Sequence, residues 1–230
     1  MATQKVVVAG SSVSASQLKD LFRQIGDGII TGHHLQAFLD HQNPWDKLPD
    51  LDWAAVYQKL GLAREFEGFR QNVVEREGFW AVPVLQGVTC NKVVAALKAL
   101  DVQFYLYAED LDQAVTKNDR DPKNGSYVIR FHRTVEADPE LANKSAQDLA
   151  ADGTKGITLL ERLLLELAYF LAMGGEHLDG ENITLCSGSR GSGGDVPGVR
   201  WSTVYRKVCV RWHGPGCRSG ALRARSVVPS

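Results

Sequence analysis

Hydrophobic positions recur with a helical period in the first part of the chain. Ser16 is a candidate N-cap for a helix with one apolar face, which consists of Leu18, Leu21, Phe22 and Ile25. A second amphipathic helix is expected from Thr31. A third is expected from Trp53 to Leu60, and Gly61 after it suits a left-handed C-terminal cap. The pattern therefore predicts a small helical N-terminal unit over residues 1–62.

The pattern changes after this unit, where helical and strand-like stretches are mixed. Three stretches have the aromatic and β-branched content of strands: 79–85, 102–107 and 126–133. Pro83 favours an edge position for the first of them, and Thr89 is placed to cap a helix after it. The turn-rich stretch 117–126 indicates a solvated hairpin turn. Residues 63–230 are thus expected to form one α+β domain.

The strongest helical signal lies at residues 159–173. Thr158 and Glu161 have the spacing of a capping box, in which each side chain accepts a hydrogen bond from the other residue's amide. The helix that follows is apolar on almost all sides, so it is predicted to be the central buried helix of the fold. Gly174 and Gly175 end it.

The tail, from Val199 to Val228, shows neither a sustained alternation nor a helical period. Its tryptophans and regularly placed valines nevertheless distinguish it from a disordered tail. We expect residues 188–221 to be ordered without long strands, with Trp201 and Trp212 fixing them to a core.

Composition narrows the function classes. The chain has 230 residues, of which 44% are hydrophobic, and its net charge of -1 gives no general attraction to nucleic acid. The C-terminal part is nevertheless rich in arginine, and Asp195 is its one acid from Arg190 onward. No secretory signal or membrane span is predicted, so a cytoplasmic location is the default, and the four cysteines are expected to be free thiols.

Four short patterns could carry chemistry, and each is better explained without it. "VVVAGSSVS" lacks the glycines of a phosphate-binding loop. Asp119 and Asp121 have calcium-loop spacing, but Lys123 stands where an oxygen ligand belongs. The histidines at 33, 34 and 41 lack the spacing of a zinc pair. Cys209 and Cys217 are too few for a structural zinc site. No metal or cofactor is therefore expected.

The tail resembles the variable proteins of diversity-generating retroelements. The resemblance rests on "ITLLERLLLELAYFLAMGGEHLD", "ENITLCSGSRGSGGDVPGVRW" and "KVCVRWHGPGCRSGALRARSVV", and on a terminal pattern that here consists of Arg218, Leu222, Arg223 and Arg225. It covers residues 79–230 and is most specific in the last fifty or so. It implies a C-type lectin-like fold of the branch that includes formylglycine-generating enzymes, with a long irregular, glycine-rich C-terminal segment and a variable region at about 186–225.

In that family, template codons of the AAC or AAT kind are mutated at their adenines. Such codons cannot yield Trp, Lys, Glu, Gln or Met, so the resemblance implies that Trp201, Lys207 and Trp212 are scaffold, and Leu222 is a further apolar anchor. The positions that such codons can reach, and that would form the ligand-binding surface, are Arg200, Ser202, Thr203, Tyr205, Arg206, Arg211, His213, Cys217, Ser219 and Ala221.

The expected function is that of a ligand-binding display protein rather than an enzyme, with a protein ligand or receptor as partner. The alternative is an oxidase of the formylglycine-generating type, with Cys209 and Cys217 as its copper-binding cysteine pair. Against it, the helix "TLLERLLLELAYFLA" replaces the "RLPTEAEWEYA"-like helix of such enzymes. A calcium-dependent carbohydrate lectin would need a Glu-Pro-Asn type motif, which the sequence lacks. The identity of the ligand and the oligomeric state stay open.

Overall fold

The computed structural model describes residues 13–27, 30, 35, 38–39 and 48–228 of the chain. It divides into two compact units, Met1–Lys47 and Leu48–Ser230. The boundary expected at residue 62 is therefore wrong. The reason is that the third helix belongs to the second unit: Tyr57 is fully buried in its core, where the phenol donates a hydrogen bond to the carbonyl oxygen of Pro83 at 2.7 Å.

The first unit contains helix α1 (Ala15–Gly26), none of whose residues is buried. Its N-cap is Ser14 and not Ser16, because Gln17 completes a capping box with Ser14. Leu35, Phe38 and Leu39 have helical backbone, as expected of a second helix. The rest of that helix and the histidines at 33, 34 and 41 lie outside the described residues.

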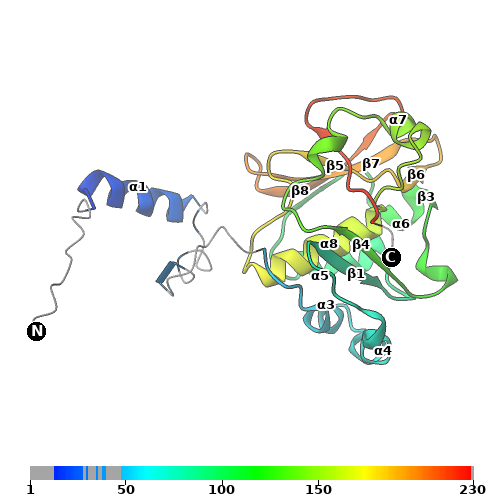
Figure 1. Ribbon diagram of the computed structural model, residues 1–230, viewed down its shortest axis with the longest axis horizontal. Helices are drawn as coiled ribbons and strands as arrows, with labels where there is room; N and C mark the ends of the chain where they lie inside the picture. The colour runs from blue at the N-terminus through cyan, green and yellow to red at the C-terminus, as the bar shows by residue number, and fades with distance from the viewer. Residues whose placement is uncertain (1–12, 28–29, 31–34, 36–37, 40–47, 229–230) are drawn as a thin grey trace, which may run out of the picture. The chain divides into compact units, whose positions relative to one another are not determined.

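The second unit mixes helices and strands, so the α+β class is correct (Figure 1). Its elements are α3 (Trp53–Lys59), α4 (Ala63–Phe69), η1 (Arg70–Asn72), β1 (Phe79–Val84), α5 (Cys90–Lys98), β2 (Phe104–Leu106), α6 (Leu111–Ala114), β3 (Val115–Asn118), η2 (Pro122–Asn124), β4 (Tyr127–His132), η3 (Pro139–Leu141), α7 (Ala146–Ala151), α8 (Leu159–Ala172), β5 (Ile183–Leu185), β6 (Ser189–Gly191), β7 (Val196–Ser202), β8 (Lys207–His213) and β9 (Leu222–Arg223).

The strands form one five-stranded sheet and two strand pairs. The large sheet has the order β2-β8-β7-β5-β9, and β1 with β4 and β3 with β6 form the antiparallel pairs. Strand β2 pairs in parallel with β8, and β5 pairs in parallel with β9. The sheet therefore joins segments that are far apart in sequence, and its centre is the antiparallel β7–β8 hairpin.

Helix α8 is the buried helix that its sequence predicts. Thr158 and Glu161 form the capping box, and all eleven residues from Leu159 to Tyr169 are buried. The helix lies between the five-stranded sheet and the β1–β4 pair (Figure 1). Trp80 of β1 meets Tyr169 edge to face, with ring centroids 5.9 Å apart.

The two faces of the five-stranded sheet have different coverings. One face packs on α8 through Val199, Val208 and Val210 and belongs to the main core. Part of the other face is covered by a smaller apolar cluster, which consists of Leu141, Ala146, Leu149, Leu185, Val196, Leu222 and Ala224. This cluster leaves the β2–β8 end of that face to solvent, where Tyr105 is 47% exposed.

Two expectations about irregular segments are wrong. Residues 188–221 do contain long strands, because β7 and β8 pair over seven residues each. Their alternation is hidden in the sequence because residues 196–199, including Pro197 and Gly198, are all buried, so both faces are covered there. The stretch 117–126 does not join a hairpin either, since the strands at its two ends, β3 and β4, belong to different sheets.

Candidate ligand-binding surface

The β7–β8 register separates the tail into core-facing and outward-facing side chains. Opposite pairs on the core side are Val199 with Val210 and Trp201 with Val208. Trp212 lies opposite Pro197 on that same side. Because side chains alternate along a strand, the residues between them face outward. The tryptophans thus point to the core and pack against it, but both are half-buried rather than fully buried.

The outward side of the hairpin brings four predicted ligand-binding residues to one face. Arg200 lies opposite Cys209, and Ser202 lies opposite Lys207. Arg211 and His213 follow at every second position of β8. The sequence-based set is therefore partly assembled by the sheet itself.

Tyr105 and Tyr107 extend this face, although the sequence analysis did not select them. Tyr105 lies beside Cys209 in the parallel β2–β8 pair, and Tyr107 follows two residues later and is 65% exposed. The guanidinium of Arg211 stacks over the Tyr105 ring at 4.9 Å from its centroid. The signal was present in the sequence as the alternation of Tyr105 and Tyr107 with the inward Phe104 and Leu106.

The hairpin tip is the most exposed part of the set. Thr203 and Arg206 are exposed, and Tyr205 is 68% exposed. Arg206 has a φ of 49°, the left-handed region in which Asn, Asp and Gly are favoured over other residues. Ser202 is buried, contrary to expectation, because its hydroxyl accepts a hydrogen bond from the Tyr205 amide at 3.3 Å and closes the turn.

Cys217, Ser219 and Ala221 lie in the loop that follows β8, away from the tip. The loop contacts α7, where the Gln147 amide donates to the Pro215 carbonyl and Arg218 pairs with Asp148 at 2.5 Å. Because β8 spans seven residues, the loop and the tip are separated by about 20 Å of strand. The ten predicted residues therefore form two regions rather than one patch. Cys217 and Ser219 are exposed, and Ala221 is half-buried.

His213 occupies a confined position at the loop end of β8. A Cβ atom on Gly198 would come within 2.6 Å of its Nε2 atom, so the imidazole uses the space that the glycine leaves free. This Nε2 atom is buried without a hydrogen-bond partner, and burial, followed by the charge of Arg211, lowers the pKa of His213. The half-buried His213 side chain therefore packs within the fold more than it contributes to the exposed surface.

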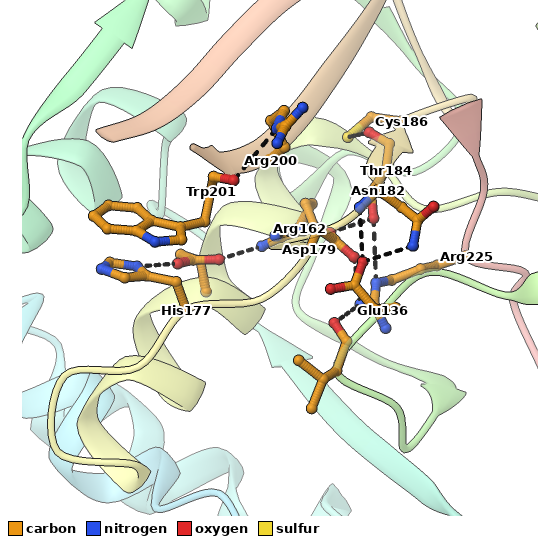
Figure 2. Close-up of polar contacts among 12 residues, drawn as sticks. Glu136, Arg162, His177, Asp179, Asn182, Thr184, Cys186, Arg200, Trp201 and Arg225 are labelled. Atoms are coloured by element: carbon orange, nitrogen blue, oxygen red, sulfur yellow. Dashed lines mark hydrogen bonds and ion pairs between the residues drawn. The ribbon is translucent and has the colours of Figure 1, made fainter. Parts of the chain in front are cut away.

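Beneath the hairpin, a network of buried charges ties α8 to the tail (Figure 2). The Asp179 carboxylate pairs with Arg162 of α8 and with Arg225, each at 2.8 Å, and accepts a hydrogen bond from the Thr184 hydroxyl. Arg162 also pairs with Glu166 at 2.7 Å. These four charged side chains are 0% exposed, and their two positive and two negative charges balance.

The same network reaches the tryptophan of β7. Glu166 lies 2.7 Å from Nδ1 of His177, and that imidazole stacks on Trp201 with a centroid separation of 3.6 Å (Figure 2). Burial acts to raise the pKa values of Asp179 and Glu166. The charges of Arg225 and Arg162 nevertheless hold the pKa of Asp179 below its usual value, and the charge of Arg162 with the hydrogen bond to His177 does the same for Glu166. The Asp179 and Glu166 carboxylates therefore stay charged at neutral pH. Through His177, the network contacts the core-facing side of Trp201.

The cysteines are free thiols, and the Cys209–Cys217 pair of the oxidase alternative is divided between the sheet and the loop after it. Cys209 is buried in β8, where its thiol contacts the carbonyl oxygen of Lys207 at 3.7 Å, whereas Cys217 is exposed in the loop. Within the described residues, neither belongs to a set of three potential metal ligands. Asp119 and Asp121 belong to no such set either, and the intervening Arg120 pairs with buried Glu161 at 2.7 Å.

One such set was missed by the sequence analysis. His132, Asp138 and Glu140 each offer a ligand atom, and these atoms lie within 4.8 Å of one another. The fold brings β4 and the segment around η3 together here, and the spacing of the three residues in the sequence does not indicate a metal site. Asp138 already accepts hydrogen bonds from the amide and hydroxyl of Ser226, both at 2.7 Å, which explains its burial.

None of the described helices combines the length and the apolar composition that crossing a membrane requires. Comparison with known proteins gives no match: no family model, no curated protein and no solved structure is similar to this chain. The geometry and the sequence pattern are thus the basis of a functional assignment.

Proposed function

We propose that this protein is a non-catalytic ligand-binding protein that displays exchangeable side chains on the β7–β8 hairpin. The observation that carries the proposal is the division of the hairpin between a core-facing side and an outward side. Trp201, Val208 and Val210 hold the strands, whereas Thr203, Tyr205 and Arg211 are exposed on the same rigid element.

This division separates stability from recognition. Substituting an exposed residue away from caps and networks usually changes the free energy of unfolding by no more than about 0.5 kcal/mol. Truncating a buried apolar residue costs about 2–5 kcal/mol. Exposed positions of the hairpin can therefore change while the fold is kept. Tyrosine and arginine are also the residues most often found at energetic centres of protein interfaces.

The resemblance to retroelement variable proteins suggests how the exposed side chains would be changed, namely by mutation of template adenines. AAC and AAT codons reach the exposed Thr203, Tyr205 and Arg206 but cannot yield the core-facing tryptophans. Asn, which these codons encode before mutation, suits the left-handed backbone at Arg206. A C-type lectin-like scaffold agrees with the α+β class and with a tail that returns as a strand beside an earlier one.

The deciding experiment is a comparison of genome sequences around this gene and of its tail in many cells. We expect a reverse-transcriptase gene beside this gene, with a near-copy of its 3′ end that differs only at adenines. Tail sequences from many cells should then vary at Thr203, Tyr205, Arg206 and Arg211. They should be constant at Trp201 and Trp212. Variation spread equally over both groups, or no near-copy, contradicts the proposal.

The oxidase alternative has its own test. Purified protein loaded with Cu(I) and offered a cysteine-containing peptide should consume no oxygen above the level of a Cys209→Ser variant. Copper-dependent oxygen uptake that this substitution abolishes would favour the enzyme.

A further inference from the structure

Three exposed side chains on the outward face lie beyond the reach of the proposed codon changes. Tyr105 lies in β2 and Tyr107 directly follows that strand, and both precede the region 186–225. Lys207 lies within that region, but lysine cannot arise from AAC or AAT codons. In the register, Lys207 and Tyr105 flank Cys209 on one face, with Arg211 stacked on Tyr105. The surface therefore contains a constant part beside the changeable tip.

The cations of this face form no ion pair with an acid in the part of the chain that the structure describes. Among the described residues, no carboxylate forms an ion pair with Arg206, Lys207 or Arg211. Arg200 donates only to the carbonyl oxygens of Trp201 and Gly180, at 3.3 Å each. Arg218, in the loop after β8, contrasts with them because it is paired with Asp148. The positive charge at the tip end is therefore left for a partner.

We propose that this face binds an acidic segment of a partner protein, with Tyr105, Tyr107 and Lys207 as constant contacts and the tip residues as selectors among partners. The proposal rests on the proposed function for its division into constant and changeable parts. Exposed tyrosines provide large contact area at low entropic cost, and unpaired cations attract a complementary acidic surface. The constant contacts would give every variant a common basal affinity, so that tip changes alter specificity without abolishing binding.

The charge pattern favours a protein segment over a nucleic acid. The exposed cations of this face are few, namely Arg206, Lys207 and Arg211, and two exposed acids, Asp101 and Glu109, precede and follow β2 in the chain. A nucleic acid would need a longer basic track along its phosphates. A compact acidic segment fits the confined patch.

The test uses three fluorescein-labelled peptides of equal length and fluorescence anisotropy with the full chain. The first contains Glu and Asp with interspersed Phe, the second has Gln and Asn in place of the acids, and the third has Lys in their place. The acidic peptide should bind at least about tenfold more tightly than the amide peptide, and added salt should weaken it. The lysine peptide should not bind.

Variants place this binding on the proposed face. Lys207→Glu and the pair Tyr105→Ala with Tyr107→Ala should each lower the affinity for the acidic peptide by about tenfold or more. Lys207→Gln should give a smaller loss. Lys117→Glu, an exposed lysine on β3 of a different sheet, should leave it unchanged. Circular dichroism should show equal melting temperatures, since all of these side chains are exposed.

Equal binding of the acidic and amide peptides, or parental affinity in Lys207→Glu, overturns the proposal. So does tighter binding of an oligothymidylate than of the acidic peptide, which would assign the face to nucleic acid. Salt-sensitive acidic binding without any near-copy of the gene's 3′ end would refute the diversification alone. A near-copy without acidic preference would refute the acidic partner alone.

Discussion

The five-stranded sheet has charged groups near both faces, and the two faces use them in opposite ways. On the α8 side, Arg162, Glu166, Asp179 and Arg225 are fully buried and mutually paired. On the outward side, Arg206, Lys207 and Arg211 are exposed and form no ion pair with any described residue. A buried pair is costly to break, whereas an exposed cation contributes little to stability. Residue type alone therefore does not separate the arginines that hold the fold from the exposed ones, whereas their ion-pair partners do.

The largest effect is expected from removing one buried partner. Arg225→Met leaves the buried Asp179 carboxylate without half of its countercharge, so it should lower the free energy of unfolding by about 3–5 kcal/mol. Urea denaturation followed by circular dichroism measures it. Arg218→Met is the matched control and should have little effect, because its ion pair with Asp148 is exposed. Equal stability of the two variants would erase the contrast between the faces.

An intermediate loss of stability is expected from overpacking the contact between Gly198 of β7 and His213 at the end of β8. Gly198→Ala places a Cβ 2.6 Å from the His213 ring, so it should cost about 1–3 kcal/mol. In a His213→Ala background the same change should cost much less, which a double-mutant cycle would reveal. Additive effects would show that the imidazole does not occupy this space.

His213 should also give a pH dependence. Its folded-state pKa is lowered by burial and by Arg211, so the neutral imidazole is the form that suits the fold. Its contribution is therefore complete above the usual value of 6.5 and declines as the pH falls through the lowered folded pKa. Urea denaturation at a series of pH values should show this decline in the parent. A His213→Asn variant that shows the same decline would assign it to other groups.

The smallest effect belongs to the exposed tip. Tyr205→Ala with Arg211→Ala should change the free energy of unfolding by no more than about 0.5 kcal/mol, since neither side chain supports the core. Thermal melting checks this, and the same double variant should bind the acidic peptide more weakly without losing it, because the constant contacts of Lys207 and the two tyrosines remain. A large drop in melting temperature would mean that the outward face is structural.

Local signals made much of the fold predictable. The capping box of α8 and the Thr89 cap of α5 involve residues three apart, so the sequence alone indicates them. The expected cap Ser16 was wrong because Ser14 is equally plausible from sequence, and Gln17 decides between them by its reach. The boundary at residue 62 was wrong because helical period does not say which core a helix joins.

Non-local pairing was beyond the sequence. The parallel contact of β2 with β8 joins segments about a hundred residues apart, and it is this contact that adds Tyr105 and Tyr107 to the surface. The half-buried state of Trp201 depends on its stack with His177, which follows α8 rather than the tail. The alternation of the hairpin was hidden because Pro197 and Gly198 are both buried, although they face opposite sides of the sheet. The smaller apolar cluster covers the outward face near them, and the sequence gives no sign of this cluster.

The position of Arg225 has a consequence for faithful copying. Its codon lies downstream of the hairpin and the loop, yet its guanidinium closes the charge balance around Asp179. Under the proposed function, substitutions in AAC and AAT codons keep this residue, whereas a copying error that inserts or deletes a base within the tail loses it. The polypeptide that such a copy encodes would then lack a stable fold and be degraded. Only in-frame copies would yield a folded protein, so the need for Arg225 would select for tails that are translated in frame to their end.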